Sequence, residues 1–190
     1  MDEFVFSGGF LDYFLFARQS LIYFPAVFFL MTEFERGLVT SFNSYFQENN
    51  VRGISYRLKQ HRFTSQFLDV LVDSLNPDYY LGIECKSISV EKGTKALYFT
   101  QHFTTDKKGV HQITRISDFL RQSGRCGFLA VELRYGAGHP REAYALPWED
   151  IRERFNSDSL KFTIEEICSY PSIIRSGGGY RVEPDVWVKK

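Results

Sequence analysis

The sequence predicts an α/β domain that follows an apolar N-terminal segment, and three observations carry this prediction. Residues 32–49 and 110–122 repeat apolar side chains at spacings of three and four, as amphipathic helices do. Residues 63–87 alternate as two short strands around a turn. Residues 126–133 (CGFLAVEL) form a continuous apolar run, which is typical of a central strand covered on both faces.

The composition indicates a globular protein. Of the 190 residues, 44% are apolar and 24% are charged. This length suits one domain with a sizeable core, which we assign to residues 31–190. The net charge of the chain is zero, and residues 31–190 hold 22 bases against 20 acids. A nucleic-acid partner would therefore need a local basic patch.

The cysteines point to a reducing compartment. Cys85, Cys126 and Cys168 are scattered and show no C-x-x-C spacing. This pattern favours free thiols and argues against a zinc site, so we expect a cytoplasmic protein.

Residues 1–30 differ from the rest of the chain. Residues 10–30 are long enough to span a membrane, but Asp12 and Arg18 interrupt them at an energetic cost. The acidic start argues against a signal peptide. Three interpretations stay open: a translation start placed upstream of the true one at Met31, a membrane anchor, or an apolar helix that packs on the domain or on a partner.

The first predicted helix, residues 32–49, begins with the pattern T-x-x-E of a capping box. Thr32 is the expected N-cap, and Glu35 would reach back to its backbone. Glu35 also lies beside the apolar face, where it could supply a further acid to a metal site. The two roles are compatible, and both stay open.

A strand is predicted next, over residues 54–60 (ISYRLKQ). It carries Arg57 and Lys59 on one face, and Arg62 follows it. One interpretation is a solvated edge, since lysine commonly guards edge strands. The other is contact with nucleic-acid phosphates, which the acids of the following strands make more attractive.

The hairpin of residues 63–87 concentrates the chemistry. Its first strand (LDVLV) carries Asp69, and its second (YYLGIECKS) carries Glu84 and Lys86 on one face. If the strands pair, Asp69 comes close to Glu84. Hard cations such as Mg²⁺ bind carboxylate oxygens, and a nearby lysine can orient a metal-activated water. The simpler alternative is an exposed face with a Glu–Lys pair.

The second predicted helix follows a strand at residues 95–99 and a polar loop. Lys107 and Lys108 in this loop are available to a phosphate backbone. His111 and Gln112 start the helix, where such residues are more often exposed than functional, and glycine ends it at position 124. The later elements are a strand, two short helices, a glycine-rich loop and a short tail, at residues 142–146, 147–155, 162–170, 176–180 and 181–190.

This order of elements resembles the PD-(D/E)xK nuclease superfamily, whose restriction-endonuclease-like core is a mixed central β-sheet flanked by α-helices. Within it, the chain looks most like the Holliday junction resolvases of the Hjc and RecU types. The similar segments are FTS before the Asp69 strand, IECKS, VHQI, GFLAVEL, AYALP and SYPSIIRSGGGYR, together with Glu35 in the first helix. They span residues 32–181 and leave residues 1–30 uncovered.

The resemblance implies a homodimeric, Mg²⁺-dependent endonuclease that cuts branched DNA, with Mn²⁺ able to replace Mg²⁺. Asp69 and Glu84 would ligate the metal, and Glu35 would be the first-helix acid. Lys86 would position the attacking water or stabilise the charge on phosphorus, and Gln112 would lie near the active site. The residues expected to contact DNA are Arg57, Lys59, Arg62, Thr64, Ser65, Lys107 and Lys108.

Two features depart from the family pattern. Leu68 stands where the family has proline, and Asp73 lies four residues after Asp69 on the same strand face. We prefer Asp69 as the ligand because an apolar stretch follows it, with Asp73 as the alternative. Three other functions stay open: a sequence-specific restriction or repair nuclease, a non-catalytic nucleic-acid-binding module, and a membrane-tethered interaction protein if residues 1–30 are an anchor.

Overall fold

The computed structural model describes residues 33–58, 67–157 and 159–188. The N-terminal segment of residues 1–30 lies outside these ranges, so its three interpretations and the domain boundary stay predictions. Other residues named above that lie outside are Met31, Thr32, Lys59, Arg62, Thr64 and Ser65. Within the described ranges, every helix falls short of the length and apolarity needed to cross a membrane.

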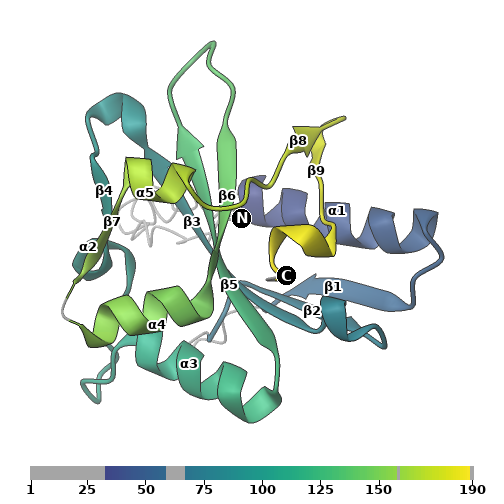
Figure 1. The fold of residues 1–190 in the computed structure, drawn as a ribbon, viewed down its shortest axis with the longest axis horizontal. Helices are drawn as coiled ribbons and strands as arrows, with labels where there is room; N and C mark the ends of the chain where they lie inside the picture. Colours follow the sequence, from purple (N-terminus) through teal and green to yellow (C-terminus); the bar gives the residue numbers. More distant parts are fainter. Residues whose placement is uncertain (1–32, 59–66, 158, 189–190) are drawn as a thin grey trace, which may run out of the picture. The chain divides into compact units, whose positions relative to one another are not determined.

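A five-stranded mixed sheet, in the order β1-β2-β3-β5-β6, lies at the centre of the domain (Figure 1). Its strands are β1 (Gly53–Arg57), β2 (Val70–Ser74), β3 (Leu81–Ser89), β5 (Cys126–Arg134) and β6 (Glu142–Pro147). β3 and β5 run parallel, and the other neighbours run antiparallel. The predicted α/β architecture, a mixed central sheet flanked by helices, is confirmed.

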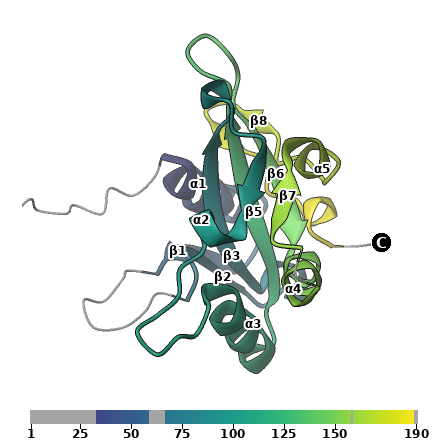
Figure 2. The same cartoon turned by 90° about the vertical axis from the view of Figure 1, so that its left-hand side faces the viewer.

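Different elements cover the two faces of this sheet (Figures 1 and 2). Helix α1 and the C-terminal residues cover one face, while α3, α4, α5 and the small sheet of β4 and β7 cover the other. The bounds are α1 (Glu33–Glu48), β4 (Ala96–Tyr98), α2 (Phe99–His102), α3 (Gln112–Ser123), α4 (Trp148–Asn156), β7 (Lys161–Thr163), α5 (Ile164–Cys168), β8 (Arg175–Ser176) and β9 (Gly179–Tyr180). Short 3-10 turns lie at Pro77–Tyr79, Val90–Lys92 and Pro184–Val186.

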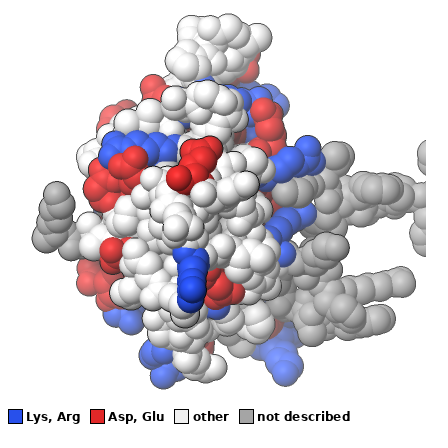
Figure 3. Space-filling view, turned by 90° about the vertical axis from the view of Figure 1, so that its right-hand side faces the viewer, with Lys and Arg blue, Asp and Glu red and all other residues white. Residues whose placement is uncertain are grey.

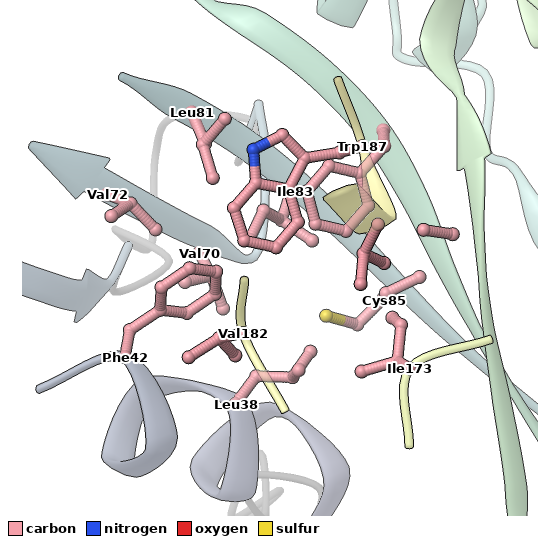
Figure 4. Close-up of a cluster of buried hydrophobic side chains, with 14 of the residues drawn as sticks. Leu38, Phe42, Val70, Val72, Leu81, Ile83, Cys85, Ile173, Val182 and Trp187 are labelled. Atoms are coloured by element: carbon pink, nitrogen blue, oxygen red, sulfur yellow. The ribbon is translucent and has the colours of Figure 1, made fainter. Parts of the chain in front are cut away.

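Strand alternation divides the core between the two faces. Leu81, Ile83 and Cys85 of β3 point toward α1, where Phe42 and Trp187 pack against them (Figure 4). These three residues form the apolar side of β3. Because side chains alternate along a strand, the even-numbered residues of β3 point toward α3. The acidic and basic residues of the E-x-K pattern are among them.

The C-terminal residues correct two predictions. The predicted loop of residues 176–180 pairs as the β8–β9 hairpin, which docks on α1. The predicted tail supplies Val182, Val186 and Trp187 to the core under α1. The predicted tail is too short to show a period, so only its packing in the structure reveals the place of these residues.

The outer edge of β1 is blocked by a side chain of α1. Ser55 N donates to Asn43 Oδ1, and Asn43 Nδ2 donates to Ser55 O, both at 2.8 Å. Asn43 thus takes the place of a neighbouring strand and protects the edge from pairing with another chain.

Replacing Asn43 with alanine should lower the free energy of unfolding by about 1–3 kcal/mol, because two backbone groups of Ser55 lose their partner. Urea denaturation measures this change. Asn49→Ala is the matched control, since the exposed Asn49 side chain donates one hydrogen bond, to Tyr45 O. Equal unfolding midpoints for the two variants would show that Asn43 does not hold the edge.

Candidate active site

A half-buried and a fully buried carboxyl group, those of Asp69 and Glu84, meet where β2 starts beside β3. Val70 pairs with Ile83, so Asp69 lies opposite Glu84. Asp69 N donates to Ile83 O at 3.2 Å, and Asp69 Oδ2 accepts from Cys85 N at 2.8 Å. The two side chains are close enough that the charge of Asp69 raises the pKa of Glu84. The structure therefore brings together the two acids that the hairpin pattern predicts to be close.

Lys86 and Gln112 complete this group. Both donate to Glu84 Oε1, Lys86 through Nζ at 2.6 Å and Gln112 through Nε2 at 2.8 Å. The amide of Gln112 is oriented because its Oε1 accepts from Thr104 N at 3.2 Å. The Glu84 side chain is only 2% exposed and that of Lys86 17%. An exposed Glu–Lys pair, the simpler alternative, is thus excluded.

Burial raises the pKa values of both acids. For Asp69 burial is the largest cause, opposed by the charge of Lys86 and by the backbone N–H of Cys85. Burial first, and then the charge of Asp69, raises the pKa of Glu84 to about 8. Burial lowers the pKa of Lys86, but the charge and hydrogen bond of Glu84 outweigh it and raise that pKa above its usual range. The carboxyl pair therefore retains a proton at neutral pH, which a bound cation would displace.

The donor set fits a hard divalent cation. Mg²⁺ is commonly held by one or two carboxylates and completes its coordination with water and substrate phosphate. Within the described ranges, no group of three or more Asp, Glu, His or Cys side chains is placed to hold a metal ion. Among these residues, a cation would therefore rest on Asp69 and Glu84.

Glu35 belongs to α1, which covers the opposite face of the sheet. It is buried, and its Oε2 lies 2.9 Å from Arg57 Nε. The charge of Arg57 in turn lowers the pKa of Asp69. The structure thus pairs Glu35 with a base, and its metal role stays a prediction. Arg57 is engaged in this ion pair, so its contact with DNA also stays a prediction.

Asp73, the alternative ligand, has other partners. Its Oδ1 lies 2.6 Å from Arg125 Nη2, and its Oδ2 accepts from Tyr56 OH at 2.8 Å. Asp73 pairs with Ile54 of β1, and it lies beyond the residues of β2 that pair with β3. Of the two aspartates, Asp69 is the one beside Glu84.

The exposed charges bear on where DNA could bind. On the face shown in Figure 3, acids and bases are interspersed, and the described residues form no large patch of one sign. Lys107 and Lys108 are exposed on the connection between α2 and α3. These two lysines offer the local basic site that a nucleic-acid partner would need on a chain with no net charge.

Two residues near Lys86, Phe103 and His102, are not indicated by any pattern in the sequence. The Phe103 ring centre lies 5.0 Å from Lys86 Nζ. Burial, and then the charge of Lys86, lowers the pKa of His102. Both residues lie at the end of α2, whose four residues are too few to show a helical period. The pattern offered no signal for them.

Helix α3 starts two residues later than predicted because His111 is its N-cap. The His111 Nδ1 accepts from Ile113 N at 3.3 Å, and its ring stacks on Phe155 with centres 4.6 Å apart. Burial, and then Arg115, lowers the pKa of His111 from its usual 6.5. The neutral ring is therefore favoured in the folded protein, which keeps Nδ1 able to accept.

Acid should weaken the protein through His111. Its pKa is lower in the folded chain, so the unfolded chain takes up the proton first as the pH falls below 6.5. The stability that the cap contributes is thus present above that pH and lost below it. His111→Asn caps without titrating, so it should lose less stability than wild type between about pH 7 and pH 5. Thermal denaturation measures both profiles, and parallel profiles would contradict the role of His111.

Comparison with known proteins gives a distant structural likeness. No family model and no curated protein matches the chain. Among solved structures, the chain is similar to the 1.6 Å structure of Archaeoglobus fulgidus Hjc, a Holliday junction resolvase from an archaeal hyperthermophile. The two are 11% identical, the match covers 78% of this chain and 89% of that chain, and the TM-score is 0.34. A match this distant assigns no activity to the chain.

Proposed function

We propose that this protein is a metal-dependent endodeoxyribonuclease that cleaves branched DNA, with the four-way junction as its principal substrate. The observation that carries the proposal is that Asp69 lies opposite the buried Glu84, with Lys86 and Gln112 hydrogen-bonded to Glu84. Acids on two neighbouring strands, with a lysine two residues after the second acid, form the arrangement expected of a PD-(D/E)xK nuclease.

Each residue of the group has a distinct role in this proposal. Asp69 and Glu84 would hold Mg²⁺ or Mn²⁺, which when bound neutralises charge on the phosphate and lowers the pKa of a water. Lys86 stays protonated beside them and donates to a phosphate oxygen or to the attacking water. Gln112 orients Glu84 through its amide N–H. Phe103 shields one side of the Lys86 ammonium.

The choice of branched DNA rests on the sequence resemblance to Holliday junction resolvases. A four-way junction is resolved by paired cuts in two strands. Two active sites related by a two-fold axis meet this need, so a homodimer is part of the proposal.

A second function, a non-catalytic nucleic-acid-binding module, is favoured by one observation. Glu35 pairs with Arg57. In the described part of the chain, the candidate site therefore has two acids, Asp69 and Glu84, and not the three that the sequence resemblance implies. Calorimetric titration with Mn²⁺ separates the two functions. The nuclease should bind the ion and lose binding in Asp69→Asn, whereas a module should give no heat of binding.

Cleavage of a synthetic four-way junction in Mg²⁺ tests the proposal, both with the full chain and with residues 31–190. The junction should be cut faster than a linear duplex of the same sequence. Asp69→Asn should remove cleavage but keep junction binding in EDTA, while Asp73→Asn should retain cleavage.

Other results would revise the proposal in defined ways. Faster cutting of the linear duplex would indicate a restriction or repair nuclease. Full activity in Asp69→Asn would refute the site, and no cleavage by the wild type would refute the nuclease. Activity of the full chain alone would show that residues 1–30 are needed.

A further inference from the structure

The chain between α2 and α3 forms a turn (Figure 2). One carboxylate, that of Asp106, holds its shape. Asp106 Oδ1 accepts from Lys108 N at 2.8 Å and from Val110 N at 2.9 Å. Asp106 N also donates to Val110 O at 3.0 Å. Gly109 has a φ of 80°, a conformation that disfavours residues with a Cβ. The turn is therefore built to a single shape.

Arg115 of α3 holds this turn from its inner side. Its Nη1 lies 3.2 Å from Asp106 Oδ2 and donates to Val110 O at 2.9 Å. The side chains of Arg115 and Asp106 are only 12% and 19% exposed. Removing one partner would leave a largely buried charge unpaired, so the pair fixes the turn to the helix.

The base of the turn is bonded to the candidate active site. Gln112 N donates to Thr104 O at 2.8 Å, and Thr104 N donates to Gln112 Oε1 at 3.2 Å. The same side chain donates through Nε2 to Glu84 Oε1. Gln112 thus fixes the position of the turn relative to Glu84.

The outer side of the turn carries two lysines. Lys107 and Lys108 are exposed, and neither side chain makes an ion pair or hydrogen bond with any residue in the described ranges. Bases nearer to the core, such as Arg57, Arg115 and Arg125, are all engaged by acids. The two lysines are therefore available to an external anion.

We propose that the turn of residues 104–110 is a preformed phosphate-binding finger. Lys107 and Lys108 bind backbone phosphates of the DNA that flanks the phosphodiester at Asp69 and Glu84, and Asp106 and Arg115 are the positioning residues that hold them. The inference rests on the proposed nuclease function. Holding the lysines in place lowers the entropy lost on binding, and phosphate contacts of this kind set the register of DNA on a protein.

The DNA affinities of two variants at Asp106 show whether the shape of the turn or only its charge matters for binding. Asp106→Ala and Asp106→Asn both remove one negative charge, but asparagine keeps an oxygen that accepts from the backbone of the turn. If the turn matters, Asp106→Ala should bind a labelled junction more weakly than wild type in EDTA, although it is more basic. Asp106→Asn should bind more tightly than Asp106→Ala. Asp118→Ala, at an exposed site on α3, is the control for charge and should bind at least as tightly as wild type.

The salt dependence of binding tests the lysines themselves. Loss of two phosphate contacts in the double variant Lys107→Ala, Lys108→Ala should reduce the slope of log affinity against log salt by about 1.8. Fluorescence anisotropy of the full chain in EDTA measures the affinity, and thermal denaturation reports the folding of each variant.

The failures of the two proposals are distinguishable. An unchanged salt slope in the lysine variant, or equal affinities for Asp106→Ala and Asp118→Ala, would overturn the finger while wild-type cleavage still stands. A wild-type protein that neither binds nor cuts DNA would instead overturn the proposed function, and the finger with it.

Discussion

Replacing Glu84 with glutamine should reduce metal-dependent cleavage of a four-way junction by at least about 1000-fold, because a bound cation supplies several kcal/mol of the barrier reduction. Glu84 is the most buried acid of the group and the one that Lys86 and Gln112 both contact. Binding of the junction in EDTA should change little. Single-turnover cleavage assays measure the loss.

The same substitution should change the stability of the metal-free protein in a pH-dependent way. The folded pKa of Glu84 is raised from 4.5 to about 8, so its contribution to stability is present at low pH and lost as the pH rises through about 8. Glutamine resembles the protonated acid and does not titrate. The variant should therefore lose less stability than wild type between about pH 6 and pH 9, as measured by urea unfolding in EDTA.

Two comparisons make this result specific to Glu84. Glu91→Gln, at an exposed position shortly after β3, should leave both cleavage and the pH profile unchanged. Mn²⁺ should restore stability to the wild type at high pH but not to Glu84→Gln. Retained cleavage in Glu84→Gln would refute the site, and an unchanged pH profile would show that Glu84 is not a buried acid that takes up a proton.

Replacing Trp187 with alanine should lower the free energy of unfolding by about 3–5 kcal/mol, the usual cost of removing a buried aromatic side chain. The Trp187 ring stacks on Phe128 with centres 5.7 Å apart and lies 5.5 Å from Phe42. Its Nε1 donates to Asp78 O at 2.8 Å. The side chain therefore closes the core between α1 and the sheet.

Urea denaturation measures this effect, with Val188→Ala as the control. Val188 follows in the chain but is 39% exposed, so its truncation should cost less than about 0.5 kcal/mol. Trp187→Phe keeps an aromatic ring but loses the hydrogen bond, and its cost should lie between the two. If Trp187→Ala costs no more than Val188→Ala, the C-terminal residues are the simple tail that their sequence suggests.

The long elements were predictable because their patterns repeat. The helices predicted at residues 32–49 and 110–122 occur at Glu33–Glu48 and Gln112–Ser123. The hairpin was predictable for the same reason, since alternation along two strands placed the acids on a common side. Short elements such as α2 and the β8–β9 hairpin span too few residues for a period to appear, so their roles were missed.

The candidate site also combines residues that the sequence could place with residues that it could not. Asp69, Glu84 and Lys86 are close in the chain and joined by one hairpin, so local geometry alone brings them together. Glu35 and Arg57 illustrate the opposite case. Each had a local role in the sequence, as a cap and as an edge residue, but in the structure they pair with each other across α1 and β1.

The sequence by itself determined the mixed α/β core, the hairpin and the meeting of its two acids, because these depend on periodicity and on neighbours in the chain. Only the tertiary structure decided that Asp73 pairs with Arg125, that Glu35 faces Arg57, and that Trp187 completes the core. These outcomes depend on strand register and on contacts between distant segments. Burial, which raises the pKa of Glu84, likewise arises only when the helices close over the sheet.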